Sequence, residues 1–232
     1  MEGKMDSKIF VEEENKLKDV VCKITKEEEN LENELKSASL QYDMENIAKG
    51  QVLQMKVKRL DDIKKIKDVP YFARMDFKED KGKLEKFYLG KLSILDSKSL
   101  EPIVVDWRAP ISNLYYEGKL GKASYECLGE QISGEIYLKR QYIIESKKLK
   151  KYVDINVTGN DELLQNALEE KADDRLKNIV ATIQDEQNKI IRSDINLPLI
   201  VQGVAGSGKT TIALHRIASV SYTHLRAHET RR

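Results

Sequence analysis

Apolar residues recur at seven-residue intervals through the first forty residues of the chain, at Phe10, Leu17, Ile24, Leu31 and Ala38. Four residues after each of these, the companion positions are only partly apolar; they are Glu14, Val21, Glu28, Leu35 and Tyr42. Sustained heptads with Lys and Glu at the other positions are typical of a long helix in a coiled coil. The pattern therefore predicts a long N-terminal helix whose seam is partly apolar.

A second helical stretch carries apolar residues at Leu53, Val57, Leu60, Ile63 and Ile66. We expect it to end before Val69-Pro70, because a residue that precedes proline disfavours helical angles. If the chain turns near Ser37–Asp43, the two stretches have nearly equal length and cover each other in an antiparallel hairpin; Gly50 is a weaker candidate for the turn. Residues 1–67 are thus predicted to form a helical coiled-coil arm. A dimerising coiled coil and a simple spacer are the alternatives, and we expect a monomer.

Between residues 71 and 145 the pattern changes to the alternation that is typical of strands. One face carries Ile132, Gly134, Ile136, Leu138, Arg140, Tyr142 and Ile144. Shorter strands are predicted at 86–90, 103–106 and 125–128, between Gly, Ser, Asp and Pro residues. We expect a small, mostly antiparallel β-rich domain over residues 70–150.

The block Asp106-Trp107-Arg108-Ala109-Pro110 follows one of these predicted strands. Trp107 is expected to anchor a core, and Asp106 and Arg108 are expected to fix a turn by ion pairing rather than to perform chemistry. The basic run 147–151 favours a solvated face over a nucleic-acid patch. No grouping of Ser, His and Asp, of Cys and His, or of paired carboxylates indicates a hydrolytic site.

The most informative segment runs from Gly203 to Thr210 and matches G-x-x-x-x-G-K-[ST]. The apolar run Leu197–Gln202 before it has the length and branching of a buried parallel strand, and the residues after it have helical spacing. A strand, a Gly-rich loop and a helix in this order are typical of a phosphate-binding loop, because backbone N–H groups and the helix N-terminus attract an anion. A chance Gly-rich turn is the alternative, and the flanking elements argue against it.

The motif assigns a role to each residue type. Gly203, Gly206 and Gly208 are expected to let the backbone approach the phosphates, since glycine adopts left-handed angles without strain. Lys209 is expected to reach the β- and γ-phosphates and Thr210 to ligate Mg²⁺, so these two residues carry the predicted catalytic roles. ATP and Mg²⁺ are the expected cofactors. The other predicted nucleotide-binding residues of the loop are Val204, Ala205, Ser207 and Thr211.

Upstream of the loop, Thr182–Ile191 has apolar residues at helical spacing, and Thr182 or Asp185 is a candidate cap. A Gln amide can donate to one edge atom of adenine and accept from its amino group. Gln187 lies sixteen residues before the loop and is therefore a candidate adenine-binding residue. Taken alone, a Gln on a short helix would be interpreted as a solvated surface residue.

Composition narrows the possibilities. The 232 residues contain 40 Lys and Arg against 39 Asp and Glu, a formal net charge of +1, so no overall positive field attracts nucleic acid. We expect no membrane partner, because there is no run of eighteen apolar residues and no signal peptide. Cys22 and Cys127 have no metal-site spacing and fit a reducing cytoplasm. Lysine disappears and two of three His occur within residues 220–232, which we interpret as a non-native tail.

Gln187 followed by 203–210 resembles the Q motif and motif I of superfamily 1 helicases. The sequences of segments 183–192 and 199–210 closely resemble those of the HelD family. The same is true of Pro70–Phe77, Asp106–Ile111, Tyr115–Glu117 and Leu138–Gln141. The resemblance is dense over roughly residues 70–218. HelD proteins are helicase-like ATPases, related to helicase IV and UvrD, that bind bacterial RNA polymerase and recycle it from unproductive complexes.

The resemblance implies an α+β chain that leads into α/β: the hairpin, the β-rich domain, and the start of a P-loop NTPase (RecA-like) domain over residues 160–219, with helical connections at 161–177. The arm would dock in the secondary channel of the polymerase, although only Asp43 and Glu45 are acidic near the expected turn. The alternatives are an ATP-dependent DNA helicase that unwinds duplexes and a non-catalytic polymerase-binding module. A small-molecule kinase fits least, because its phosphate loop usually lies near the start of the chain.

Phosphoryl transfer requires more than the phosphate loop. It also needs an acidic Mg²⁺ partner, a water-positioning residue and an arginine finger. In superfamily 1 motors these lie well downstream of the loop. We therefore interpret the chain as the N-terminal part of an ATP hydrolase, and expect it to bind nucleotide weakly or not at all and not to turn it over.

Overall fold

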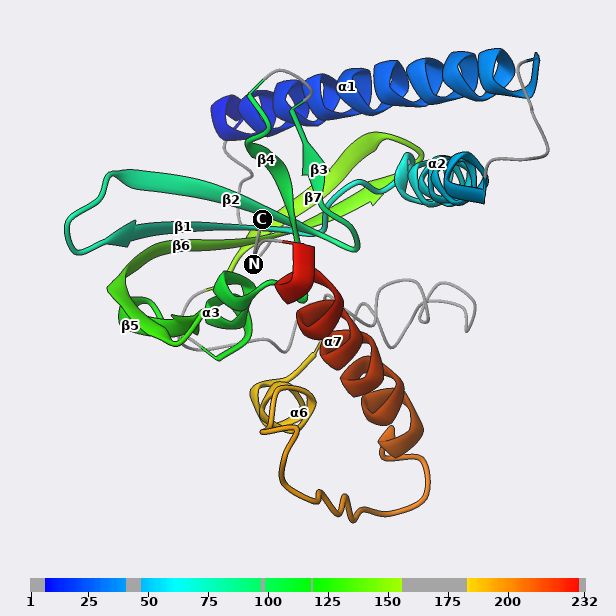
Figure 1. The fold of residues 1–232 in the computed structure, drawn as a ribbon. Coiled ribbons are helices and arrows are strands. Elements are labelled where there is room, and N and C mark those ends of the chain that lie inside the picture. Colours follow the sequence, from blue (N-terminus) through cyan, green and yellow to red (C-terminus); the bar gives the residue numbers. More distant parts are fainter. Residues whose placement is uncertain (1–6, 41–46, 97–98, 118, 156–182, 230–232) are drawn as a thin grey trace. The chain divides into compact units, whose positions relative to one another are not determined.

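The computed structural model describes residues 7–40, 47–96, 99–117, 119–155 and 183–229 (Figure 1). The chain forms two compact units. The first unit comprises Met1–Ala73, Tyr88–Val105 and Arg140–Val153, and the second comprises Arg74–Phe87, Asp106–Lys139 and Asp154–Arg232. This division groups the N-terminal helices with several strands, and the domain bounds expected from the sequence stay a prediction.

Two long helices belong to the first unit: α1, Ser7–Leu40, and α2, Ile47–Ile66. α2 ends before Pro70 as predicted, and Gly50 lies inside it. The expected near-equal lengths are wrong, because α1 has 34 residues and α2 has 20. The turn expected at 37–43 lies partly outside the described residues.

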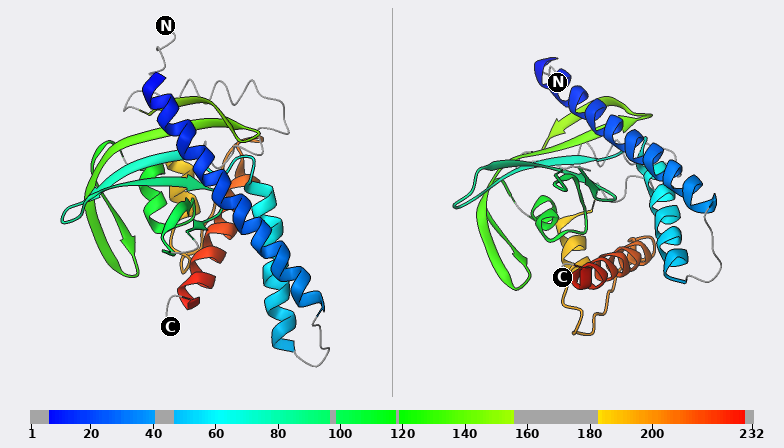
Figure 2. Two further views of the ribbon diagram at one scale, coloured as in Figure 1. Left: turned by 90° about the horizontal axis from the view of Figure 1, so that it is seen from above. Right: turned by 45° about the horizontal axis from the view of Figure 1, so that its top comes forward.

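The two helices run side by side for part of their length (Figure 2). Four ion pairs join acidic side chains of α1 to basic side chains of α2 and of the residue that follows it: Glu27–Arg59, Glu28–Lys67, Glu32–Lys64 and Glu34–Lys56. The pairs made by Lys56 and Lys64 are exposed and each stabilise the fold only slightly, whereas those made by Arg59 and Lys67 are partly buried. The coiled-coil hairpin itself stays a prediction.

The N-terminal half of α1 packs into the core of the first unit. Glu13, Leu17, Val20 and Ile24 lie on one helical stripe and are each at most 1% exposed. The heptad pattern correctly placed Leu17 and Ile24 inside, and Val21 of the companion row packs partly buried against the core, but the pattern did not anticipate the fully buried Glu13 and Val20. The core cluster consists of Leu17, Val20, Ile24, Ile63, Ile66, Tyr71, Tyr88, Ile94, Val104, Tyr142, Ile144 and Leu149.

Glu13 is a charged residue inside this core. Its carboxylate accepts hydrogen bonds from Arg140 Nη1 at 2.8 Å and from the Tyr88 hydroxyl at 3.2 Å. The Arg140 guanidinium also lies 4.5 Å from the centre of the Tyr152 ring. A buried charge is tolerated when it is paired and hydrogen-bonded, so this contact fixes α1 against the strands.

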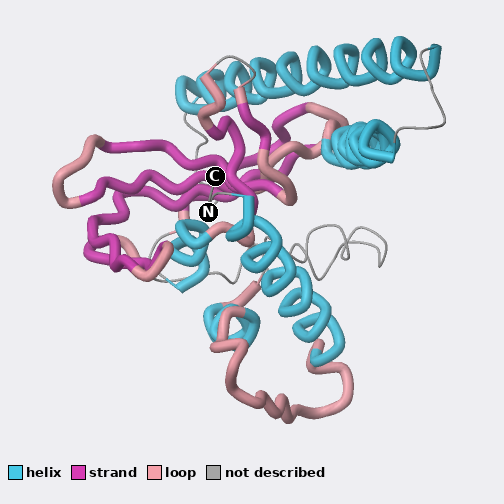
Figure 3. The backbone as a smooth tube through the Cα atoms, in the orientation of Figure 1, coloured by secondary structure: helices cyan, strands magenta, loops and turns pink. Residues whose placement is uncertain are grey.

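Seven strands hydrogen bond in the order β3-β4-β2-β1-β6-β5, and β7 also pairs with β6 (Figure 3). Their bounds are β1 Ala73–Glu79, β2 Leu84–Gly90, β3 Ile94–Leu95, β4 Pro102–Asp106, β5 Gly121–Cys127, β6 Glu130–Glu145 and β7 Lys148–Asp154. The β3/β4 and β5/β6 pairs are antiparallel. The strands predicted at 86–90, 103–106 and 125–128 correspond to β2, β4 and β5.

The alternation predicted along β6 is confirmed from Ile132 to Leu138, where the intervening residues are exposed, but it is lost afterwards because Lys139, Arg140, Gln141 and Tyr142 are all buried. A Cβ at Gly134 would lie 2.2 Å from the Lys78 carbonyl oxygen, so this strand requires glycine for close approach. The chain thus has a long N-terminal helix followed by a sheet, which is an α+β arrangement.

The second unit contains the short 3-10 helix η1, Pro110–Ser112, and the helices α3, Asn113–Glu117, α6, Asp185–Ile191, and α7, Lys209–Glu229. The helical connections expected at 161–177 lie outside the described residues. None of the described helices combines the length and the apolar character that crossing a membrane requires.

The buried parallel strand predicted at 197–202 is wrong. The segment is a loop between α6 and α7 (Figure 3), and the side chain of Ile200 is 93% exposed. A parallel strand exists only where a neighbouring strand accepts and donates its backbone hydrogen bonds. No strand in the described ranges pairs with 197–202, so its apolar pattern alone did not produce a strand.

Candidate functional site

The loop that precedes α7 has the backbone that its glycines were expected to permit. Gly206 and Gly208 have φ angles of +81° and +79°, which side chains other than glycine rarely adopt. Gly203 does not have the left-handed φ that was expected of it, and a Cβ there would lie 2.7 Å from Ser207 Oγ, a contact that rotation of the Ser207 side chain can relieve. Gly206 and Gly208 therefore shape the loop through their left-handed angles.

Lys209, the first residue of α7, closes this loop on itself. Its Nζ donates to the carbonyl oxygens of Gly203 at 2.8 Å and Val204 at 2.7 Å, and lies 3.4 Å from Ser207 Oγ. The backbone N–H of Ser207 donates to the Val204 carbonyl at 3.2 Å. The predicted residues 203–209 are thus brought together around one ammonium group.

The loop faces solvent. Val204 is 78% exposed, and Ala205, Ser207 and Thr210 are also exposed, while Thr211 is half-buried. A turn of this kind at the start of a long helix presents backbone N–H groups and the positive end of the helix dipole to an anion. The arrangement fits a phosphate group, with Lys209 available to exchange its carbonyl partners for phosphate oxygens.

A metal at this site would depend on Thr210 and on the phosphate oxygens. In the part of the chain that the structure describes, no three or more His, Cys, Asp or Glu side chains gather as a metal site. Mg²⁺ is commonly held by one or two protein ligands together with substrate phosphates and water. The exposed hydroxyl of Thr210, beside Lys209 at the start of α7, fits that role.

Gln187 lies in the first turns of α6 and is half-buried. Its Oε1 accepts a hydrogen bond from the backbone N–H of Gln184 at 3.2 Å. The helix begins at Asp185 and its N-cap is Gln184. Asp185 is therefore not the cap, and Thr182, the other expected cap, lies outside the described residues. Among the described residues no hydrogen bond joins Gln187 to 203–210, and its adenine role stays a prediction.

The Asp106–Pro110 block forms the ion-paired turn that the sequence predicted. Arg108 donates to Asp106 through Nε at 2.8 Å and through Nη2 at 2.6 Å. Trp107 is 4% exposed, and its ring lies 5.4 Å from the His215 ring of α7, edge to face. Burial lowers the pKa of His215 below its ordinary value, so this ring stays neutral near pH 7.

Sequence reasoning missed three side chains that connect these elements. Arg192 donates to backbone carbonyls of the Asp106–Pro110 turn, Arg216 of α7 donates to carbonyls at the C-terminal end of α6, and Asn188 of α6 bonds to α3. Arg192 and Asn188 lie in segment 183–192, whose sequence resembles the HelD family. That resemblance was the signal that could have pointed to them. Nothing in the sequence pattern singled out Arg216.

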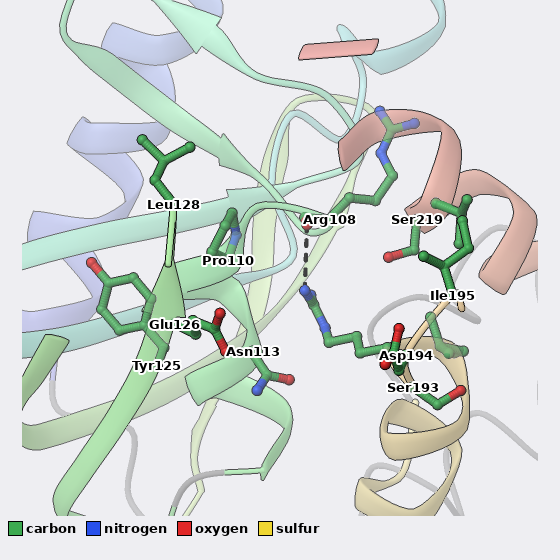
Figure 4. Close-up of a pocket in the computed structure, with 13 residues that line it drawn as sticks. Arg108, Pro110, Asn113, Tyr125, Glu126, Leu128, Ser193, Asp194, Ile195 and Ser219 are labelled. Carbon is green, nitrogen blue, oxygen red and sulfur yellow. Dashed lines mark hydrogen bonds between the residues drawn. The ribbon is translucent and has the colours of Figure 1, made fainter. Parts of the chain in front are cut away.

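An open pocket of about 430 Å³ lies beside the same turn (Figure 4). Its lining includes Arg108, Asn113, Tyr125, Asp194 and Ser219, and the dashed line in the figure marks the bond from Arg192 Nη1 to the Arg108 carbonyl at 3.3 Å. None of the predicted nucleotide-binding residues lines this pocket. The pocket and the glycine loop are therefore separate features of the second unit.

Lys139 is a buried amine near α3. It is 5% exposed, and its Nζ donates to the Tyr115 carbonyl oxygen at 2.7 Å. Burial lowers the pKa of Lys139 to about 8. The carboxylate of Asp185 opposes this shift, which relates the amine electrostatically to the start of α6.

A family model described as "DNA helicase IV HelD, N-terminal domain" matches residues 10–174. The chain belongs to this family, and the HelD resemblance noted in the sequence is confirmed. A comparison with curated proteins gave no match.

Proposed function

We propose that the chain is the N-terminal part of a superfamily 1 helicase-like ATPase that binds bacterial RNA polymerase and uses ATP to recycle it. The observation that carries the ATP part of the proposal is the closed loop at 203–209, with Lys209 at its centre and α7 behind it. The family match supports the helicase-like class. Polymerase binding rests on the resemblance of the chain to HelD proteins.

In the proposed site, the triphosphate lies against the backbone N–H groups of the loop. Lys209 exchanges the Gly203 and Val204 carbonyls for the β- and γ-phosphates, and Thr210 holds Mg²⁺, which neutralises phosphate charge. Gln187 binds the adenine edge after it releases the Gln184 N–H. The cost of that release is about one ordinary hydrogen bond, roughly 1 kcal/mol.

Equilibrium binding of a fluorescent ATP analogue in Mg²⁺ tests the phosphate site on the full chain. We expect weak binding that falls at least about tenfold in Lys209→Ala, because the charge at the phosphates is lost. Lys18→Ala is the matched control, since it removes the same charge from an exposed pair with Glu14 in the first unit. Equal affinity of both variants, or no binding by the unaltered chain at millimolar nucleotide, contradicts the proposed site.

Polymerase binding needs a different test. Deleting 1–67 would remove Leu17, Val20 and Ile24 from the core, so loss of binding by that deletion would say nothing about the arm. Exposed positions of α2 are better targets: Val52 is 52% and Met55 68% exposed.

The full chain and its Val52→Glu/Met55→Glu variant are to be co-purified with bacterial core RNA polymerase. We expect the variant to bind at least fivefold more weakly, on the order of 1 kcal/mol. Leu128→Glu, an 84% exposed apolar position in the second unit, is the control that should bind normally. Unchanged binding of the α2 variant would exclude this surface, and absence of binding by the unaltered chain would contradict the polymerase proposal.

An ATP-dependent DNA helicase is the second candidate, because the matching family model carries the description DNA helicase IV. The two candidates differ in partner. Binding of the chain to a labelled DNA duplex with a single-stranded tail, together with no binding to polymerase, would favour the helicase.

A further inference from the structure

Arg192 fixes the C-terminal end of the short helix α6. Its hydrogen-bond acceptors among the described residues are backbone carbonyls and the Asn188 amide oxygen. Arg192 Nη2 donates to the Trp107 carbonyl at 2.7 Å, Nη1 lies 3.3 Å from the Arg108 carbonyl, and Nε donates to Asn188 Oδ1 at 3.0 Å. The planar guanidinium presents five N–H donors in one rigid fork, so several bonds to one turn define the direction of the side chain. Arg192 therefore ties the end of α6 to the Asp106–Pro110 turn.

That turn is itself rigid. Arg108 makes two side-chain bonds to Asp106, and the buried Ser112 hydroxyl donates to the Asp106 carbonyl at 2.8 Å. The carbonyls that receive Arg192 are held between these bonds. The turn is therefore a rigid docking point, or seat, for the C-terminal end of α6, and it does not rearrange when α6 moves.

A second arginine ties the same end of α6 to the helix that carries the phosphate loop. Arg216 of α7 donates through Nη1 to the carbonyls of Ile190 at 3.1 Å and Ser193 at 2.9 Å, and through Nη2 to the Asp194 carbonyl at 3.1 Å. Arg216 lies two turns after Lys209 on one continuous helix. Ile190 belongs to the last turn of α6, whereas Ser193 and Asp194 follow the helix, so Arg216 binds both the end of α6 and the residues just after it.

Asn188 completes the attachment in the middle of α6. It is fully buried, and its Nδ2 donates to Asn113 Oδ1 at 2.6 Å and to Glu117 Oε1 at 3.1 Å. Gln187 is the neighbouring residue. A helix of seven residues held at these points moves as one body, so the place of Gln187 follows from the contacts of Arg192, Arg216 and Asn188.

We propose that the Asp106–Pro110 turn is the seat of the adenine-binding helix, and that Arg192 and Arg216 are positioning residues that set Gln187 relative to the phosphate loop. This inference rests on the proposed nucleotide site. It assigns a role to the Asp106–Pro110 block that the ion pair inside the turn does not explain by itself. Base recognition then depends on Arg192, whereas phosphate binding depends on Lys209.

The test is the affinity of the full chain for Mg-ATP, Mg-GTP and Mg-tripolyphosphate, measured by competition against a labelled ATP analogue. Gln187→Ala gives the ratio of ATP to GTP affinity without base recognition. Arg192→Lys keeps the charge and loses the fork. We expect it to lower the ATP/GTP ratio about threefold to tenfold, towards that of Gln187→Ala, with tripolyphosphate affinity within twofold. Arg59→Lys, which shortens an arginine fork on Glu27 in the first unit, should leave every value unchanged.

Each other outcome overturns the inference. An unchanged ATP/GTP ratio in Arg192→Lys shows that Gln187 is placed independently of the turn, and a parallel loss of all three ligands shows a structural role only. If the unaltered chain binds tripolyphosphate but does not discriminate ATP from GTP, the phosphate site stands and the base-recognition role fails. If it binds none of the three, the proposed site fails as well. Should circular dichroism show that Arg192→Lys is unfolded, Arg216→Lys decides the question by the same ratio.

Discussion

The buried Glu13 carboxylate gives the sharpest stability prediction. Glu13 is 1% exposed, and Arg140, its partner at 2.8 Å, is 5% exposed. Removing one member of a buried ion pair typically costs about 3–5 kcal/mol, because the other charge stays out of water without that partner. We therefore expect Glu13→Ala to lower the free energy of unfolding of the first unit by that amount.

The neighbouring residue provides the control. The Glu14 side chain is 34% exposed and pairs with Lys18 one turn later on the same helix. Such a pair stabilises a helix by about 0.3–0.5 kcal/mol, so Glu14→Ala should differ little from the unaltered chain. Both changes put Ala into α1 and carry the same small gain in helix propensity, which cancels in the comparison.

Urea unfolding, followed by two signals, measures the difference. Circular dichroism reports on the helices of both units, with α1 and α2 in the first and α7 in the second, whereas the fluorescence of Trp107, the chain's one tryptophan, reports on the second unit alone. Glu13→Ala should shift the dichroism midpoint well below that of Glu14→Ala, and in a thermal melt by on the order of 10 °C. Adding Arg140→Met should recover part of the loss, since an apolar side chain replaces the buried charge. Equal midpoints for Glu13→Ala and Glu14→Ala would refute the reasoning.

Two further predictions concern a buried lysine and two glycines. Burial lowers the pKa of Lys139 to about 8, whereas a lysine in an unfolded chain titrates near about 10.4. The unfolded state thus holds more protons between these values, so the free energy of unfolding should rise by about 2 kcal/mol from pH 8 to pH 10. Urea midpoints of Lys139→Met should show no such rise, and an equal rise in that variant would exclude Lys139 as its cause. Gly134→Ala places a Cβ 2.2 Å from the Lys78 carbonyl oxygen and 2.6 Å from the Phe77 ring, and should destabilise by about 1–3 kcal/mol in thermal melts. Gly50→Ala, with open space in α2, should stabilise by up to about 1 kcal/mol, and the reverse order of melting temperatures would contradict both assignments.

Local pattern predicted much of the fold. The alternation from Ile132 to Leu138 and the turn at Asp106–Arg108 depend on neighbouring residues, so the sequence was sufficient for both. The companion row of α1 depended on which side of the helix faces the strands. That choice is made by Tyr88 and Arg140, which are distant in sequence from Glu13, and the heptad pattern could not anticipate it.

Some features of the candidate site could likewise be predicted from the local sequence, and others could not. The left-handed angles of Gly206 and Gly208 follow from the motif, because only glycine adopts them freely. The strand predicted at 197–202 depended on a neighbouring strand, which an apolar run does not supply. Arg192 and Arg216 bind backbone carbonyls, and a carbonyl acceptor has no signature in the side-chain sequence. Contacts of this kind are visible only once the backbone has been placed.

The continuity of α1 has a mechanical consequence. From Ile24, the last fully buried residue of the stripe, the helix continues to Leu40 without a break, a distance of about 24 Å. A tilt of about 5° at the buried end would displace the far end by roughly 2 Å over that length. The helix therefore acts as a rigid lever anchored in the core. A force applied near Leu40 would strain the buried contacts of Glu13 at the other end.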